Sequence, residues 1–486
     1  MHSLNILLPK KDRVLAILLS FLLIFLYLLP ISYHGLLGAF FLIDPDAVYV
    51  ANALSNIKWQ IISYFDHPGT PAISVISIAL IPLRFYSKFI IDQNFIYWSY
   101  LNIDFIFLYL RIFQTVILGV GLYLFLVSLY KINKSLIDQF IGFTLFFSFL
   151  PIYYAGISIS AEALSIFLGS VFIFLFISYL SIKSNIRLIL MLIISGLAFS
   201  NRATAIIYPI IGVLLILQTK KIMYLIYIFI GFMLGALPLK SLIFEMLKRI
   251  MLFAGSTEVH AAGDKRLFDF TVYLESFLTY WNRDTILLLL VGIVFTYSIF
   301  KLRKKDDSKI IGLIGILSSL IILIFAKFSL AHYQISNYLI ILFCFIFYIK
   351  NLKYGYKLGI LILCIISSLG IYQKYYTEVY AASLNSANLE RFIIKNPSDN
   401  NTSWEWARSK EYSLIWINNW GSGVYNDFMI KNKCWDRYYI QKVSLEQFIK
   451  NNNDYKFDVV EIDGVKDIVL LKPKNFEGFP NHFCQK

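Results

Sequence analysis

Long apolar runs alternate with short basic clusters along most of this chain. Runs such as Val14–Pro30 and Leu313–Phe325 contain no charged residue, and about 20 such residues in a helix cross the hydrocarbon core of a bilayer. We predict about eleven transmembrane helices. The first three cover about Val14–Tyr33, Phe105–Tyr130 and Leu136–Ile152, the seventh covers Ile222–Leu239, and the others end near Leu180, Arg202, Lys220, Lys301, Phe328, Lys350 and Tyr372.

The basic clusters predict the orientation of these helices. Lys10, Lys11 and Arg13 precede the first span, which places the N-terminus in the cytoplasm because basic loops stay inside. The run Ala72–Ile91 also resembles a span, but Pro82, Arg84 and Lys88 interrupt it, and counting it would move Lys131 and Lys134 outside. We therefore predict that it forms an interfacial helix at the outer face.

The composition changes near Gln373. Residues 1–372 form the predicted transmembrane module, with outer loops at 34–104 and 240–284, whereas residues 373–486 are polar and contain alternating stretches such as DVVEIDGVKDIVLLKP. Alternation of this kind is typical of strands. The predicted fold is an all-α polytopic membrane protein with a small C-terminal α/β extracytoplasmic domain.

The charge of the chain agrees with this class. The net charge is +14, yet only 15% of residues are charged and 58% are hydrophobic. Because the basic residues fall in short loops and no basic patch is interleaved with accessible aromatics, we exclude nucleic acid as a partner. The expected location is a multi-pass position in a membrane, such as the bacterial inner (plasma) membrane, with the C-terminal domain outside.

Two acids follow the first span, at Asp44 and Asp46. A carboxylate there could act as general base on an acceptor hydroxyl, or the pair could hold a divalent cation through hard oxygen ligands. Asp46 could equally be the N-cap of a helix beginning at Ala47. Clustered ionisable groups at a membrane boundary favour a functional role over a purely structural one.

Further ionisable groups are predicted at the same outer face. Asp66 can set the tautomer of His67 and help it to bind a phosphate, although Pro68 and Gly69 also fit a simple turn. Arg202 follows the fifth span, where a guanidinium can grip phosphate in bidentate fashion or merely snorkel to the interface.

The remaining candidates are Glu162, His332 and Tyr333. Glu162 opens the fourth span, where a carboxylate also complements the helix dipole. His332 and Tyr333 mark an outer turn and could contact a lipid phosphate or a sugar, although aromatic residues are common at membrane interfaces.

The order of these features resembles the GT-C superfamily of polyprenyl-phosphate-sugar-dependent glycosyltransferases, and especially protein O-mannosyltransferases and lipid A aminoarabinose transferases. The segment from Asp46 to Tyr49 is similar to their Asp-Glu-x-x-Tyr segment, with Ala47 at the Glu position. Asp66-His67-Pro68 resembles their acid-(His or Lys)-Pro-Pro element, with Gly69 replacing the second proline. Glu162 matches their acid at the fourth span, and Arg202 falls where they carry a phosphate-binding Lys.

This resemblance implies an inverting transfer from a polyprenyl-phosphate-linked sugar to a lipid, glycan or protein acceptor at the outer face. Arg202, His67 and His332 would hold the phosphate, and Asp46 or Asp44 would take the acceptor proton. No cofactor is required, and Mg²⁺ or Mn²⁺ is compatible with the acid pair. Two other functions remain open: a transporter or flippase of lipid-linked sugars, and a non-catalytic assembly subunit, which Ala47 favours.

Overall fold

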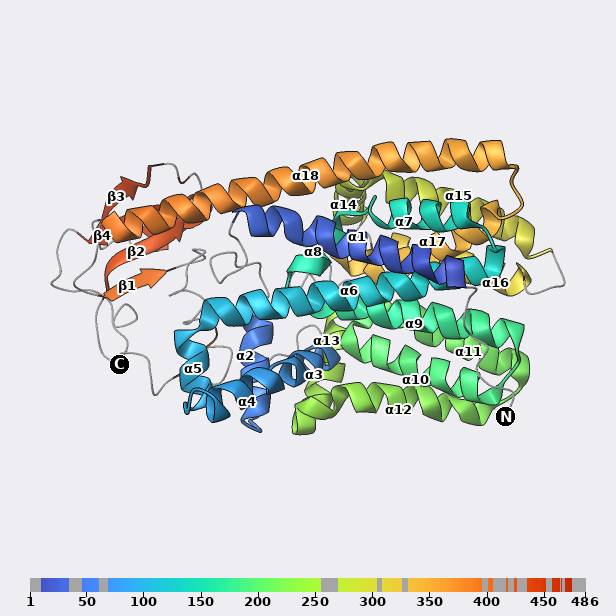
Figure 1. The fold of residues 1–486 in the computed structure, drawn as a ribbon, viewed down its shortest axis with the longest axis horizontal. Coiled ribbons are helices and arrows are strands. Elements are labelled where there is room, and N and C mark those ends of the chain that lie inside the picture. The colour runs from blue at the N-terminus through green and yellow to red at the C-terminus, as the bar shows by residue number, and fades with distance from the viewer. Residues whose placement is uncertain are drawn as a thin grey trace. The chain divides into compact units, whose positions relative to one another are not determined.

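The structure is a computed structural model, shown as a ribbon in Figure 1. It describes residues 10–34, 46–60, 69–254, 270–303, 308–325, 331–395, 401–404, 417, 424–425, 435–451, 457–463, 465 and 468–473. Asp44, Asp66 and His67 lie outside the described residues, and so do the cysteines of the polar tail.

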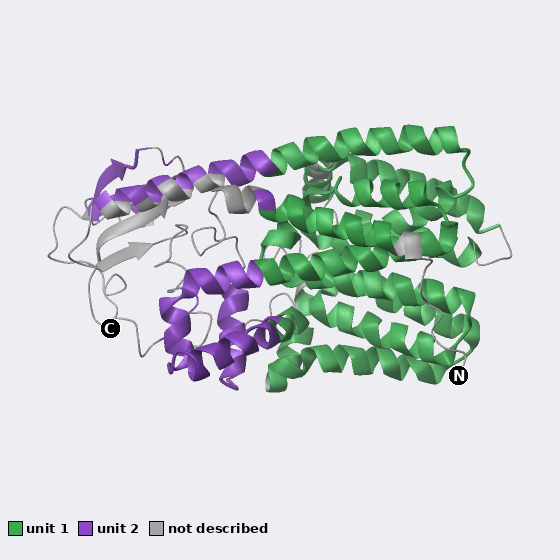
Figure 2. Cartoon of the chain, in the orientation of Figure 1, with its two compact units in different colours: residues 1–28, 64–75, 112–375 green, residues 29–63, 76–111, 376–486 purple. Residues whose placement is uncertain are grey.

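The chain divides into two compact units (Figure 2). Unit 1 comprises residues 1–28, 64–75 and 112–375, and unit 2 comprises residues 29–63, 76–111 and 376–486. Four helices continue through the residue numbers at which the units divide: α1 (Lys10–His34), α3 (Thr70–Ala79), α6 (Ile103–Asn133) and α18 (Tyr354–Lys395). Helix α18 also runs through residue 373, where the composition of the sequence changes.

Helices make up the described part of unit 1. Besides the four shared helices they are α7 (Leu136–Phe146), α8 (Leu150–Ile157), α9 (Ala161–Ser181), α10 (Asn185–Asn201), η1 (Ala203–Ile206), α11 (Ile207–Thr219), η2 (Ile222–Tyr224), α12 (Leu225–Ala236), η3 (Leu237–Leu242), α13 (Ile243–Ala254), α14 (Phe270–Arg283), α15 (Thr285–Lys301), α16 (Ser308–Phe325), η6 (Ala331–Gln334) and α17 (Ile335–Ile349). Helix α17 is buried along its whole length.

Each of the predicted spans coincides with a helix or a pair of helices. Seven helices among the described residues are long and apolar enough to cross a membrane, and the bent pair of α7 and α8 would make an eighth span. One of the seven, residues 70–89, is the run that we predict to be interfacial, and four shorter apolar helices, 14–29, 185–201, 203–219 and 285–301, coincide with the remaining predicted spans. The prediction of a polytopic helical membrane protein is therefore confirmed.

The third predicted span is broken rather than straight. Helices α7 and α8 meet at an angle of 77°. Pro151 lies in the first turn of α8, where its missing N–H costs nothing, whereas inside a continuous helix it would remove a hydrogen bond. The proline therefore explains why a second helix begins here.

The run that we predict to be interfacial forms two consecutive helices, α3 and α4 (Ile81–Phe89). Pro82 lies in the first turn of α4, and Lys88 lies in its last turn. By length and composition alone, residues 70–89 could also cross a membrane. The interfacial position of this stretch therefore stays a prediction.

Two helices of unit 1 approach each other through glycines. A Cβ added at Gly196 on α10 would collide with the backbone of Ile228 on α12, and one added at Gly231 would collide with the backbone of Ile193. Small residues let helix backbones pack closely where apolar surroundings supply no hydrophobic driving force. This contact fixes the position of α10, whose last residue precedes Arg202.

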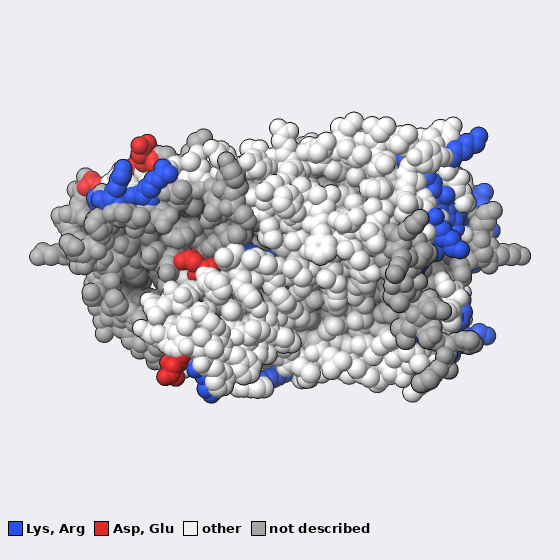
Figure 3. Space-filling view, viewed as in Figure 1, with Lys and Arg blue, Asp and Glu red and all other residues white. Residues whose placement is uncertain are grey.

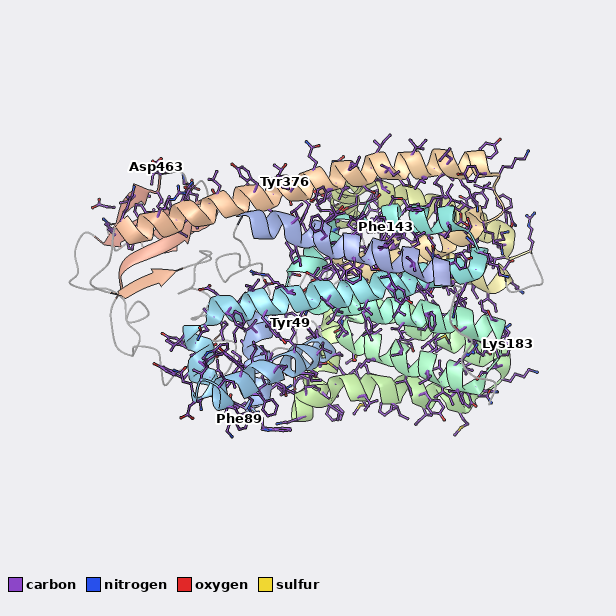
Figure 4. All side chains as sticks on the ribbon, in the orientation of Figure 1. Tyr49, Phe89, Phe143, Lys183, Tyr376 and Asp463 are labelled. Carbon is purple, nitrogen blue, oxygen red and sulfur yellow. The ribbon has the colours of Figure 1, made fainter. Side chains whose placement is uncertain are left out.

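Basic side chains of unit 1 gather at one end of its helices (Figure 3). Lys183, labelled in Figure 4, lies at this end. In the same unit the Lys357 ammonium pairs with the buried carboxylate of Asp138 at 2.8 Å, and Asn133 donates a hydrogen bond to the same carboxylate. Lys183 belongs to a basic cluster that the positive-inside rule predicts to face the cytoplasm.

Unit 2 contains α2 (Asp46–Ile57), α4, α5 (Phe95–Leu101), α20 (Lys442–Asn451) and a four-stranded sheet. The strands are β1 (Asn401–Trp404), β2 (Trp435–Gln441), β3 (Phe457–Glu461) and β4 (Ile468–Pro473), in the order β1-β2-β4-β3. Strand β1 pairs parallel with β2, and the other two pairs are antiparallel. The small C-terminal domain is thus α/β, as predicted.

One part of the polar tail packs on the short helices of unit 2. The Tyr425 hydroxyl lies 3.1 Å from the Ser99 hydroxyl on α5, and the Lys58 ammonium donates to the Val424 carbonyl. Burial raises the pKa of the Tyr425 phenol, so the hydroxyl stays protonated at physiological pH. This contact ties the tail to the helices next to Asp46.

Candidate functional site

Asp46 opens helix α2 and is completely buried. An acid in the first turn complements the partial positive charge of the helix N-terminus. Its Oδ2 also accepts a hydrogen bond from Arg111 Nη2 at 2.9 Å, and neither side chain is exposed. Tyr49, labelled in Figure 4, is likewise buried on α2. The structure thus makes Asp46 half of an ion pair inside unit 2.

Arg111 pairs with a candidate site residue, and the sequence analysis missed it. It lies inside α6, one turn after Phe107, and its guanidinium stands 5.3 Å from the centre of that ring. A lone arginine within an apolar run was the available signal, because an ionised group in a membrane span needs a partner. The sequence did not show which acid that partner would be.

Glu162 and Arg202 form a second buried ion pair, inside unit 1. Glu162 lies in the first turn of α9, and Arg202 follows the last residue of α10 with an extended backbone. Arg202 Nη2 donates to Glu162 Oε1, and the two side chains are 8% and 10% exposed respectively. The structure therefore brings together two residues that lie 40 positions apart.

Tyr333 and His332 complete this cluster. The Arg202 guanidinium stands 5.2 Å from the centre of the Tyr333 ring, a distance at which the ring face attracts a cation. The His332 ring lies 4.5 Å from the Tyr333 ring, and both residues belong to η6. Four of the predicted donor-site residues therefore meet in unit 1. We call Glu162, Arg202, His332 and Tyr333 the Arg202 cluster.

The Arg202 cluster retains hydrogen-bonding capacity. Arg202 Nε, Glu162 Oε2 and the hydroxyl of nearby Thr204 are buried and have no hydrogen-bond partner in the described part of the chain. Buried polar atoms are normally satisfied, and exceptions mark a site for water, an ion or a ligand. The donor on Arg202 and the acceptor on Glu162 suit a ligand that offers both an anionic oxygen and a hydroxyl.

The structure leaves some predicted residues and the metal untested. Asp44, Asp66 and His67 lie outside the described residues. No group of three His, Cys, Asp or Glu side chains among the residues described could hold a metal ion. The cation site at Asp44 and Asp46 therefore stays a prediction, and Arg111 would compete with a cation for the Asp46 carboxylate.

Comparison with known proteins identifies the fold. No protein-family model matches the chain, and no curated protein matches its sequence. Among solved structures, ArnT from Cupriavidus metallidurans bound to undecaprenyl phosphate is similar, with a TM-score of 0.53 and 10% sequence identity. The match covers 96% of this chain and 98% of that one.

The apo structure of the same ArnT is also similar, with a TM-score of 0.49, 10% identity and coverage of 94% of this chain and 97% of that chain. ArnT is a lipid A aminoarabinose transferase with the GT-C fold. The resemblance that the sequence motifs indicate is thus confirmed at the level of the fold. This chain is a multi-pass membrane protein with the fold of ArnT.

Proposed function

We propose that the protein is an integral-membrane glycosyltransferase that moves a sugar from a polyprenyl-phosphate-linked donor to an acceptor at the outer face of the membrane. The fold match with a transferase bound to undecaprenyl phosphate supports a lipid-phosphate donor. The observation that carries the proposal is the Arg202 cluster, because it pairs a buried guanidinium with a carboxylate and leaves Arg202 Nε unpaired among the described residues.

The Arg202 guanidinium can bind a phosphate while it stays paired with Glu162. A guanidinium carries five N–H donors, and Glu162 Oε1 accepts from Nη2 only. The Nε–H, which has no partner among the described residues, then donates to a phosphate oxygen, and His67 and His332 add further donors. Positive charge held in place before the reaction stabilises the phosphate as it leaves.

In the proposed reaction, an acceptor hydroxyl attacks the anomeric carbon of the sugar. The new C–O bond forms as the bond to the phosphate oxygen breaks, and the phosphate keeps that electron pair. Asp46 or Asp44 takes the hydroxyl proton. Attack from the face opposite the phosphate inverts the anomeric carbon. The phosphate is already a good leaving group, so no second carboxylic acid is required, unlike in glycoside hydrolases.

The substitution Asp46→Asn tests this role. We expect sugar transfer in isolated membranes to fall at least about 100-fold, the scale of a lost general base, while undecaprenyl phosphate still binds. Asp138→Asn is the matched control, because Asp138 is equally buried and also paired with a cation, Lys357. Loss of transfer in both variants would point to damaged folding instead. Unchanged transfer in Asp46→Asn would exclude Asp46 as the base.

A transporter of lipid-linked sugars is the second candidate function, because ionisable groups in a membrane bundle also line transport paths. The two functions differ in their product. A transferase releases free polyprenyl phosphate from the donor, whereas a transporter moves the donor intact. Proteoliposomes loaded with a labelled lipid-linked sugar should accumulate free polyprenyl phosphate once acceptor is added. Movement of the label without cleavage would contradict the proposal.

A further inference from the structure

Asn201, the last residue of α10, is hydrogen-bonded to the start of α9, the helix that carries Glu162. It is completely buried. Its side-chain Nδ2 donates to the Ala161 carbonyl at 2.9 Å and to the Ser165 hydroxyl at 2.8 Å. Ala161 directly precedes Glu162, and Asn201 directly precedes Arg202. The amide therefore bonds the start of α9 to the end of α10 beside both members of the ion pair.

The same residue also caps helix α3. Its backbone carbonyl accepts the N–H of Gly69 at 2.8 Å, and its Oδ1 accepts the N–H of Ala72 at 3.2 Å. Gly69 is the N-cap of α3, since its carbonyl accepts the first helical bond from Ile73. Normally the side chain of the N-cap residue accepts the N–H of the third helical residue, which is Ala72 in α3.

Gly69 occupies the N-cap position but has no side chain that could accept the N–H of Ala72. Its φ of 46° lies in the left-handed region, where glycine carries no steric penalty. Pro71 lacks an N–H, so Ala72 is the first residue after Thr70 that needs an acceptor. Asn201 supplies that acceptor from a distant helix. The cap thus links α3 to α10, and α3 is the helix that the chain enters directly after His67 and Pro68.

We propose that Asn201 is a positioning residue that holds the start of α3 and the Glu162–Arg202 pair in the arrangement that binds the donor phosphate. Only an amide can fill this role, because it accepts on Oδ1 and donates twice from Nδ2. An aspartate would lose both donors, and an aliphatic side chain would lose all three bonds. This inference rests on the proposed donor and adds a residue that touches neither the phosphate nor the sugar.

The test measures binding of undecaprenyl phosphate to the full-length protein in lipid nanodiscs. We expect Asn201→Ala to raise the dissociation constant about tenfold, and Ser165→Ala, which removes one of the four bonds and should fold normally, to raise it about threefold. Gln139→Ala is the control, because Gln139 is an equally buried amide that donates to a backbone carbonyl of the same unit, that of Leu126. It should leave the dissociation constant unchanged.

A purely structural role would lower the amount of folded protein without altering the dissociation constant of what remains. Wild-type affinity in folded Asn201→Ala and Ser165→Ala would therefore overturn the positioning role while the proposed donor stands. An equal rise in the dissociation constant of Gln139→Ala would also overturn it, since any buried amide would then matter equally. If the wild-type protein bound no undecaprenyl phosphate, the proposed donor would fail first, and the inference would fail with it.

Discussion

Two of the buried ion pairs in the described part of this protein differ in how completely their surroundings enclose them. Asp46 and Arg111 are both 0% exposed, whereas Arg202 and Glu162 keep 8% and 10% of their side-chain surface. Arg111 lies within a regular helix against Phe107. Arg202 instead lies between two helices, in extended backbone.

We therefore expect the fully enclosed pair to contribute more to stability, and the Arg202 pair to contribute more to phosphate binding. Removing one partner of a fully enclosed pair leaves a buried, uncompensated charge, which is far more costly than the pair itself is favourable. A pair at a helix junction can accept a further ligand, because its remaining donors are already oriented. We therefore expect the two pairs to respond differently to the same kind of substitution.

The largest effect is expected for Arg111→Met. The substitution strands the Asp46 carboxylate in apolar surroundings and should lower the free energy of unfolding by about 3–5 kcal/mol. Unfolding of the purified protein by titration with SDS measures it. The double variant Asp46→Asn with Arg111→Met should recover most of this stability and still fail to transfer sugar. If Arg111→Met alone were as stable as the wild type, the Asp46–Arg111 pair would not be the one that stabilises the fold.

An intermediate effect is expected for Arg202→Ala, and it should fall on binding more than on stability. A hydrogen bond to a charged group contributes about 1.5–3 kcal/mol, so affinity for undecaprenyl phosphate should fall about 10- to 100-fold. Arg202→Lys retains the charge without the planar fork and should lose less. Titration in nanodiscs gives both values. If Arg202→Ala destabilised the protein as much as Arg111→Met, both pairs would be structural.

The smallest effect is expected at Tyr333. Its ring faces the Arg202 guanidinium, and such a contact contributes about 0.5–2 kcal/mol. Tyr333→Leu should therefore weaken binding of undecaprenyl phosphate a few-fold, whereas Tyr333→Phe, which keeps the ring, should bind almost normally. The same titration compares the two. Equal losses in both variants would assign the role to the hydroxyl instead of the ring.

The pattern of apolar and basic residues was sufficient to predict the apolar, span-like helices of this protein, because hydropathy is a property of each segment by itself. It predicted the spans, the polar tail, and Glu162 and Arg202 as candidates at helix ends. The break between α7 and α8 was missed, although Pro151 was visible in the sequence. The hydropathy and charge of single segments therefore account for most of the fold and for the choice of several candidate site residues.

The sequence by itself determined which segments are apolar and where charges interrupt them. The tertiary structure alone decided which charges pair: Asp46 with Arg111, 65 positions away, and Glu162 with Arg202. It also decided that Asn201 caps α3 across 129 positions. Such partners depend on how helices pack, and packing brings together residues that no local pattern connects. A buried charge or amide must be satisfied, but the sequence leaves open which distant group satisfies it.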